Sequence, residues 1–535
     1  MRLARMGSSH PHRLSFLRIL LRRAGAERWR FSTPIWDINA GGVGHAVLCA
    51  QTPERTYSLV AFAHDLPDAA RSDRVIATAW DATFALFDGV PDAEDIARLA
   101  ANVPLQEAGR VSERELTLSR ANRSVRLWEH VVEALAAGRQ PDAARIDEVG
   151  YLMRTTAVYG SGKFGAQDRA AIAARPECAA PFQVEMLTVY LIRAFVADLV
   201  EHMARARSPG AVPLERSLRQ RLGIGNSTGL GMAPFVINHP ALIDRWVTAR
   251  ETALARVRAL EGFSATDQAA FGALVTRAAG AVDRWQSAHP VQVEKISALK
   301  QDIAALQGFL GAGPIVSWDA IAAWAEEHLS LEGQEWTVAL LLELQGPLVD
   351  DLADSMACDE DAPVDGGQAL GALARELAET YAFCETADWD DPPETARIWY
   401  TSQEKLEPRL GERHEEPLGA YEQPLQPARD AARLVAALTA AGTPDATVAE
   451  FLARHPEHRH TVRRAQLAAR HDYAEVRDNT IHAQMLPIDL LRFKLAFFGA
   501  RAFDPRSDRW VRITLFDGAP YPGDLTPETA DRWLN

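Results

Sequence analysis

The sequence contains few cysteines, few lysines and no long hydrophobic segment. Its four cysteines, Cys49, Cys178, Cys358 and Cys384, are far apart and form no CxxC pair, which argues against a zinc knuckle and a disulfide framework. A reducing cytoplasm is therefore the expected environment. Charged residues interrupt every apolar run before it reaches the roughly 18 to 20 residues of a transmembrane helix, so we expect no membrane span.

Length and charge narrow the class of protein further. At roughly 100 to 200 residues per domain, the 535 residues are enough for two to four domains. The apolar content of 47% and the charged content of 24% are typical of a folded globular chain. The 57 basic and 72 acidic residues give a formal net charge of −15. This is the wrong sign for attraction to a phosphate backbone, so we expect no nucleic-acid partner.

The first 31 residues reverse this acidic character. They carry eight arginines and one acid, Glu27, around a short, mainly apolar stretch from Leu14 to Leu21. Arg22 and Arg23 follow this stretch where a signal peptide would have a small-residue cleavage site, so a basic helical arm is expected instead. The sequence allows three docking partners for the arm: its own chain, an acidic partner and a second copy of the chain in a homo-oligomer.

Local patterns predict β-rich segments near both ends of the chain and helices between them. Alternation and β-branched residues indicate strands at Ala46–Ala50, Tyr57–His64, Arg74–Phe87 and Arg509–Phe516. Helix starts are indicated by Pro181, Pro240, Ser264 with Asp267, Pro290 and Ser317, and by Ser112 with Glu115, a capping box ahead of a helix that ends near Gly138. A second expected helix, opened by Pro141, has Ile146, Val149 and Met153 on its buried face.

These patterns predict an α+β fold with a predominantly α-helical body and a small antiparallel β-sheet formed by N- and C-terminal segments. We divide the chain into a basic arm (1–31), a β-rich segment (32–91), a helical body with glycine-rich loops (92–387) and a C-terminal α+β segment (388–535). Packing of the last segment on residues 32–91 is one option. The Arg-Ser-Asp-Arg and Leu-Phe-Asp-Gly-x-Pro motifs occur near both ends, either from an ancient duplication or as a shared turn.

The densest functional signal is the stretch from Arg154 to Gly165, in which an expected helix runs into a loop with three glycines. Backbone N–H groups of such a loop approach an anion closely, with Lys163 as the counter-charge. Ser161 and Gly162 belong to the same loop, and Tyr159 is a candidate acid or base beside Lys163. The alternative is a structural loop with a solvated Lys163.

Two known motifs resemble this stretch incompletely. A nucleotide-hydrolase phosphate loop needs G-x-x-x-x-G-K-[ST], but Ala157 replaces the first glycine and Phe164 replaces the serine or threonine. Tyr159 and Lys163 have the Tyr-x-x-x-Lys spacing of short-chain dehydrogenases, so an oxidoreductase is kept as an alternative. The glycine-rich turn that opens that family after its first strand is missing.

A second glycine-rich stretch, Leu222 to Pro234, encloses Asn226, Ser227 and Thr228 directly after Gly225. Polar residues of this kind cap a helix N-terminus, and the same geometry with an open cap binds carboxylate or phosphate. The alternative is a tight interhelical crossing in which glycines permit close backbone contact.

Two further groups of charged residues are weaker candidates. The expected helix from Pro181 to Ala206 carries Glu185 and Arg193 among apolar residues, where a charge must be paired or face a polar cavity. Structural ion pairs are the alternative for both. Lys405 and Arg409 form a candidate anion clamp in the C-terminal part of the chain.

The combined residues predict a soluble enzyme that binds a small anionic metabolite, carboxylate or phosphate, between the two glycine-rich loops. Proton transfer without a metal or a recognisable cofactor favours a lyase, isomerase or hydrolase. The candidate catalytic residues are Tyr159, Lys163 and Glu185. The candidate substrate-binding residues are Arg154, Ser161, Gly162, Arg193, Gly225, Asn226, Ser227, Thr228, Lys405 and Arg409.

The opposing hypothesis is a non-catalytic helical scaffold whose basic arm contacts an acidic partner. An enzyme is expected to lose activity on Lys163→Met, and a scaffold is expected to respond to deletion of residues 1–31.

Overall fold

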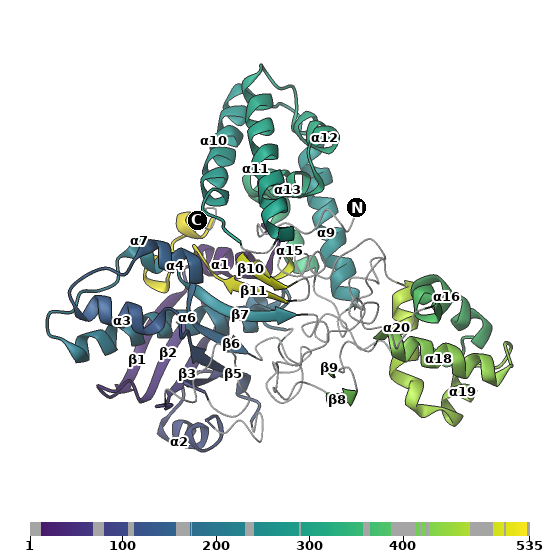
Figure 1. Ribbon diagram of the computed structural model, residues 1–535, viewed down its shortest axis with the longest axis horizontal. Helices are drawn as coiled ribbons and strands as arrows, with labels where there is room; N and C mark the ends of the chain where they lie inside the picture. Colours follow the sequence, from purple (N-terminus) through teal and green to yellow (C-terminus); the bar gives the residue numbers. More distant parts are fainter. Residues whose placement is uncertain are drawn as a thin grey trace.

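The computed structural model places a large curved β-sheet beside several groups of helices (Figure 1). It describes residues 12–67, 80–104, 112–156, 172, 174–229, 240–287, 290–356, 364–386, 413–416, 419–422, 427–470, 496–507 and 510–531.

Nine strands form the large sheet, in the order β1-β2-β3-β4-β5-β6-β7-β11-β10. All neighbouring strands are antiparallel except β6 and β7, which are parallel. The strands are β1 (Arg30–Ile38), β2 (Gly44–Gln51), β3 (Thr56–Ala63), β4 (Ala82–Asp88), β5 (Glu115–Arg123), β6 (Tyr151–Thr156), β7 (Gly223–Gly229), β10 (Arg501–Ser507) and β11 (Trp510–Leu515).

The expected small antiparallel sheet built from the two ends of the chain is therefore wrong. The sheet is large and mixed, and seven of its nine strands, β1 to β7, lie between Arg30 and Gly229. The C-terminal strands β10 and β11 are added next to β7 and do not pair with β1 to β4. The sequence analysis missed β5, β6 and β7 because it assigned their residues to a helical body.

Two local helix signals in this region lead into strands. The Ser112 hydroxyl donates to the Glu115 carboxylate at 3.3 Å, a bond between side chains that lacks the backbone N–H partners of a capping box, and Glu115 begins β5. The expected helical face from Ile146 to Met153 is interrupted by Gly150, whose φ of 76° ends α4 (Ala143–Val149) just before β6. Pairing with neighbouring strands outweighs the local helix preference in both places.

Helix α6 (Gln183–Arg207) is the main element on one face of the sheet. Twenty of its 25 residues are buried, so it must be covered on more than one side. It contacts β3, β5, β6 and β7, and α1 (Phe16–Ala26) and α3 (Trp128–Ala136) pack against it. On the opposite face, α2 (Ala93–Asn102) buries Leu99 against apolar side chains of β2 to β5.

A group of long helices extends the same apolar core beyond the sheet. Buried residues from these helices and from the sheet form one continuous cluster. The helices are α9 (Pro240–Arg258), α10 (Ala265–Val282), α11 (Pro290–Gly311), α12 (Trp318–His328) and α13 (Leu331–Leu344), and Figure 1 shows most of their length above the sheet.

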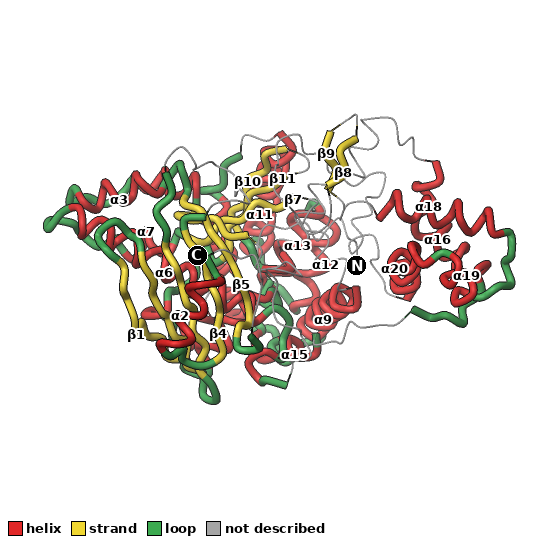
Figure 2. Tube along the Cα trace, turned by 90° about the horizontal axis from the view of Figure 1, so that it is seen from below, coloured by secondary structure: helices red, strands yellow, loops and turns green. Residues whose placement is uncertain are grey.

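A smaller helical bundle has an apolar core of its own. Leu373, Leu434, Phe451 and Val462 belong to this separate cluster. Figures 1 and 2 show the bundle at the end of the molecule opposite β1 to β4. Its helices are α16 (Leu370–Thr386), α18 (Pro427–Ala441), α19 (Val448–Arg454) and α20 (Arg459–Arg470).

Short elements connect these parts. They are η3 (Pro176–Cys178), α7 (Arg216–Gln220), α14 (Gly346–Val349), α15 (Leu352–Ser355), β8 (Arg413–Glu416), β9 (Gly419–Glu422), η6 (Pro456–His458), η7 (Pro522–Asp524) and α23 (Pro527–Asp531). Among the helices in the described ranges, none is both long enough and apolar enough to cross a membrane.

Candidate functional site

The two glycine-rich stretches begin in neighbouring parallel strands, the first at the end of β6 and the second along β7 itself. Because the strands are parallel neighbours, the chain leaves their carboxyl ends side by side. Residues 157–171 follow β6 and residues 230–239 follow β7, and both segments lie outside the described residues. In sheets with parallel strands, ligands commonly bind beyond the carboxyl ends of the strands.

The N-terminal part of α6 lies at the same edge. The hydroxyl oxygens of Thr188 in α6 and Thr117 in β5 are 2.8 Å apart. Arg120 of β5 is opposite Thr156, the last residue of β6, so Thr117 lies beyond the end of β6. The partial positive charge of the helix N-terminus therefore points towards this edge.

Buried polar side chains lie on the sheet face that is turned away from α6. Ser119 and Thr155 share a 2.7 Å hydrogen bond on the α6 face, together with Thr117. Strand alternation then places Arg120, Asn122 and Arg154 on the opposite face. Their exposed fractions are 7%, 2% and 1%, so two buried guanidinium groups lie on neighbouring strands.

The same face carries a partly buried base, His64, just after β3 and a buried acid, Asp81, just before β4. His64 Nε2 lies 3.1 Å from the Thr83 hydroxyl. Burial lowers the pKa of His64, and the nearby Asp81 carboxylate opposes this effect. Asp81 accepts a hydrogen bond from the Arg123 backbone N–H at 2.9 Å. A His64 imidazole that is neutral at pH 7 is able to accept a proton.

We call Arg120, Asn122, Arg154 and His64 the polar row. Arg154 is the one member that the sequence analysis selected, because it directly precedes a glycine-rich loop. The other three alternate with apolar residues along strands. The alternation of polar and apolar residues along a strand could have identified Arg120 and Asn122. The sequence analysis had assigned both to a helix, in which residues two positions apart share no face.

Several predicted site residues lie outside the described part of the chain. They are Tyr159, Ser161, Gly162, Lys163, Lys405 and Arg409. For Ser227 and Thr228 the structure describes the backbone in β7 and leaves the side chains undescribed.

Gly225 and Asn226 lie on β7 beside β6. Gly225 is opposite Arg154, and the Asn226 side chain is 6% exposed. A Cβ atom on Gly225 would lie 2.5 Å from Tyr151 Cγ, and one on Gly223 would lie 2.3 Å from the Leu515 carbonyl oxygen. Glycine therefore permits a close approach between neighbouring strands here, whereas the sequence analysis had considered a close crossing of helices.

Glu185 and Arg193 are at different ends of the sheet. Glu185 is in the first turn of α6, where burial, with smaller contributions from Glu177 and Glu185, raises the pKa of the neighbouring Cys178 thiol to about 12. Arg193 is eight residues further along the helix, about 12 Å at 1.5 Å per residue. Its Nε atom donates to the Leu222 carbonyl at 2.7 Å, just before β7 begins.

Arg193 is fully engaged by backbone carbonyl groups. Besides Leu222 it donates to the carbonyl oxygens of Gln220, Ala519 and Pro520, at 3.1, 2.9 and 3.3 Å. Its guanidinium carbon also lies 3.9 Å from the centre of the Tyr521 ring. These contacts tie residues 519–521 to the start of β7 and favour the structural alternative for Arg193.

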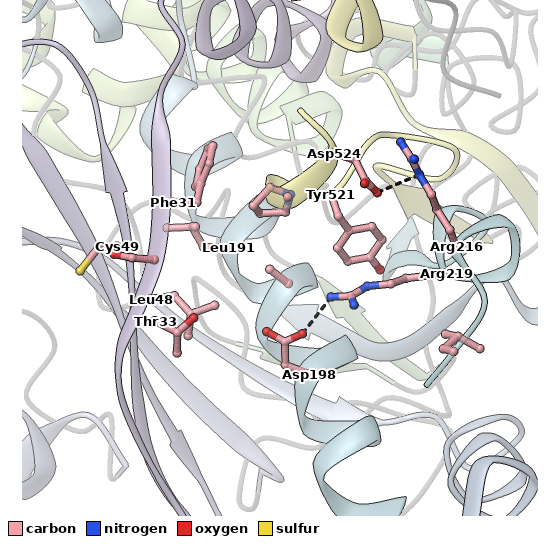
Figure 3. Close-up of a pocket in the computed structure, with 15 residues that line it drawn as sticks. Phe31, Thr33, Leu48, Cys49, Leu191, Asp198, Arg216, Arg219, Tyr521 and Asp524 are labelled. Carbon is pink, nitrogen blue, oxygen red and sulfur yellow. Dashed lines mark hydrogen bonds and ion pairs between the residues drawn. The ribbon is translucent and has the colours of Figure 1, made fainter. Parts of the chain in front are cut away.

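A cavity of about 410 Å³ lies on the α6 face of the sheet, near the β1 edge (Figure 3). Phe31 and Thr33 of β1, Leu191 and Asp198 of α6, and Arg219 of α7 are among the residues that line it. The polar row is on the opposite face, so the cavity is a separate feature.

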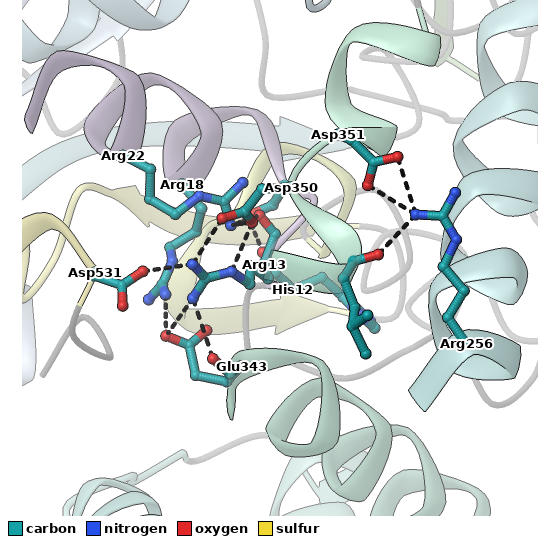
Figure 4. A network of polar contacts seen from close by, with 11 residues as sticks. His12, Arg13, Arg18, Arg22, Arg256, Glu343, Asp350, Asp351 and Asp531 are labelled. Carbon is teal, nitrogen blue, oxygen red and sulfur yellow. Dashed lines mark hydrogen bonds and ion pairs between the residues drawn. The ribbon is translucent and has the colours of Figure 1, made fainter. Parts of the chain in front are cut away.

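The N-terminal arm docks on acidic residues of its own chain (Figure 4). Arg13 forms ion pairs with Asp350 and Asp531, and Arg18 forms one with Glu343. Arg18 and Glu343 are 0% and 3% exposed, so this pair is part of the protein interior. Arg22 lies 2.9 Å from Asp350.

Comparison with known proteins assigns no family to the chain: no family model, curated protein or solved structure matches it. Within the described ranges, no group of three or more His, Cys, Asp or Glu side chains is placed to hold a metal ion.

Proposed function

We propose that this protein is an enzyme that binds a small anionic metabolite, a carboxylate or a phosphate, at the carboxyl ends of β6 and β7. The observation that carries the proposal is the parallel pairing of β6, which holds the buried Arg154, with β7, so that both strands end at the sheet edge where α6 begins. Buried arginines and a helix N-terminus both favour a bound anion, because little water is present to screen their charge.

Proton transfer is the chemistry that these groups support best. Burial lowers the pKa of His64, which favours the neutral, proton-accepting form, and Tyr159 and Lys163 remain candidates on sequence grounds as an acid or base and its partner. A lyase, isomerase or hydrolase acting without a metal would use such groups. The free thiols of Cys49 and Cys178 agree with a cytoplasmic protein, which is part of the same proposal.

The test is thermal unfolding in the presence of inorganic phosphate, pyruvate, malate, a sugar phosphate and AMP. It is run on the wild type, on Lys163→Met and on Lys300→Met. Lys300 is a matched control, since its side chain is 41% exposed and lies 3.8 Å from Asp283. A ligand at 100 times its dissociation constant stabilises the native state by about 2.7 kcal/mol, which a melting curve detects.

We expect one class of anion to raise the melting temperature of the wild type and of Lys300→Met, and to have no effect on Lys163→Met. A shift that is equal in all three proteins would remove Lys163 from the site. No shift of the wild type with any probe would favour the non-catalytic scaffold.

A further inference from the structure

The cavity on the α6 face is enclosed by parts of the chain that are far apart in the sequence. Its walls come from β1 and β2, from α6, from α7 and from η7 near the C-terminus. Apolar side chains, among them Phe31, Leu48 and Leu191, form one side. Figure 3 shows the charged side chains of Asp198, Arg219 and neighbouring residues on the other side. Cavities of this size and mixed character commonly hold small molecules.

Four charged side chains line the cavity, two of each sign. Arg216 and Arg219 are three residues apart on α7 and therefore on the same side of that helix. Arg219 donates to Asp198 of α6 at 2.8 Å, and Arg216 Nε lies 3.2 Å from a carboxylate oxygen of Asp524 in η7. The cavity thus presents two ion pairs and no net charge.

The two ion pairs differ in how firmly they are held. Arg219 also lies 3.6 Å from Glu201, and its guanidinium carbon is 4.4 Å from the centre of the Tyr521 ring. The Arg216 side chain is 64% exposed, so its contact with Asp524 is screened by water and contributes little. The Arg216 and Asp524 pair is therefore the one that a ligand is able to separate.

We propose that this cavity binds a free α-amino acid with an apolar side chain. The ligand carboxylate pairs with Arg216 and its ammonium group pairs with Asp524, so that one ion pair is replaced by two. The apolar side chain of the ligand packs against Phe31 and Leu191. A ligand with a single charge pairs with one member of the separated pair and leaves the other to water, so the zwitterion forms one ion pair more and is the better match.

This inference does not rest on the proposed function. The cavity and the polar row lie on opposite faces of the sheet, and the amino acid binds through residues that the anion site does not use. Lys163→Met is therefore expected to leave amino-acid binding unchanged, so that failure of one proposal is distinguishable from failure of the other.

The test is isothermal titration calorimetry of the full chain with leucine, phenylalanine, N-acetylleucine and leucine amide. The last two probes each lack one charge of the zwitterion. The variants are Arg216→Gln and Asp524→Asn, with Arg258→Gln as the matched control. Arg258 is another partly exposed arginine in an ion pair, with Asp319 on α12.

We expect leucine or phenylalanine to bind the wild type and Arg258→Gln equally, and about two- to fivefold more weakly to each cavity variant. N-acetylleucine and leucine amide are expected to bind about two- to fivefold more weakly than leucine. Three results would overturn the proposal: no binding of either amino acid, equal binding of N-acetylleucine, or full affinity in both cavity variants. Melting curves of the variants without ligand confirm that each is folded.

Discussion

Replacement of Arg193 by methionine tests whether this residue supports the fold or binds substrate. The side chain is 1% exposed and its guanidinium group donates to four backbone carbonyls. Methionine keeps much of the length and the apolar volume but donates no hydrogen bond. A structural role predicts a large loss in the free energy of unfolding, whereas a ligand-binding role predicts a loss of affinity with little change in stability.

The expected loss of stability depends on which hydrogen bonds the four carbonyl groups keep in the variant. Gln220 still accepts from the Gly518 N–H, Pro520 from the Tyr190 hydroxyl at 2.9 Å, and Leu222 from the Tyr521 hydroxyl at 3.3 Å. Within the described residues, the Ala519 carbonyl keeps no other donor. One orphaned buried carbonyl costs about 1–3 kcal/mol, and losing bonds from a charged donor costs about 1.5–3 kcal/mol. We therefore expect the free energy of unfolding to fall by about 3–5 kcal/mol. This is well below the sum for four independent hydrogen bonds from a charged donor.

The assay is urea unfolding followed by tryptophan fluorescence, with Arg258→Met as the control. Arg258 has ion pairs with Asp319 and Glu326 and is 30% exposed, so its replacement is expected to cost no more than about 1 kcal/mol. An Arg193→Met protein whose unfolding free energy is within 1 kcal/mol of the wild type would refute the structural role. The substrate-binding role suggested by the sequence would then regain support.

Three further predictions concern the core, the parallel strands and the polar row. Leu17→Ala is expected to cost about 2–5 kcal/mol in urea unfolding, because Leu17 is fully buried in α1; a cost below 1 kcal/mol would show that α1 is not part of the stable core. Gly225→Ala is expected to cost about 1–3 kcal/mol, because the new Cβ would lie 2.5 Å from Tyr151 Cγ; wild-type stability would contradict this packing. Burial lowers the pKa of His64 below its ordinary value of 6.5, so between the two values the unfolded state binds more protons; the wild type should lose stability as the pH falls from 7.5 through 6.5 towards the lower folded pKa. His64→Gln should lose less over this pH range, and identical pH profiles would contradict the assignment.

Strands with clear alternation could be predicted from the sequence. The residues expected for β2, β3 and β11 agree with the structure to within about two positions, and the expected strand ending at Phe87 includes all of β4 except Asp88. Two helix starts that carry their own capping residues were also predicted correctly, whereas the one expected at Ser112 and Glu115 was not. Ser264 and Asp267 form the expected capping box of α10, and the Ser317 side chain caps α12.

The centre of the sheet could not be predicted from local patterns. β6 pairs with β7, although about 70 residues separate them in the sequence, and α6 lies between them in the chain. β7 is a strand with glycine at Gly223, Gly225 and Gly229, a composition that local propensity disfavours in a strand. Its conformation is set by β6 and β11 on either side, which no short-range pattern records.

The similar motifs near the two ends of the chain also require the structure for their interpretation. Gly89 after β4 and Gly518 after β11 both have positive φ, 92° and 77°. Phe87 is still paired in β4, whereas Phe516 has a φ of 61° and lies beyond β11. The two motifs therefore share a glycine with positive φ after a strand but differ in backbone conformation at the phenylalanine.

The docking of the arm changes which experiment separates an enzyme from a scaffold. Deletion of residues 1–31 would remove Phe16 and Leu17 from the core, would leave Glu343 buried without Arg18, and would shorten β1. An uncompensated buried charge alone costs about 3–5 kcal/mol, so this deletion would unfold an enzyme and a scaffold alike. Loss of function on that deletion therefore says nothing about an external partner. A deletion limited to residues 1–11 spares every one of these contacts, so a partner that depends on the basic arm has to be sought with that shorter deletion.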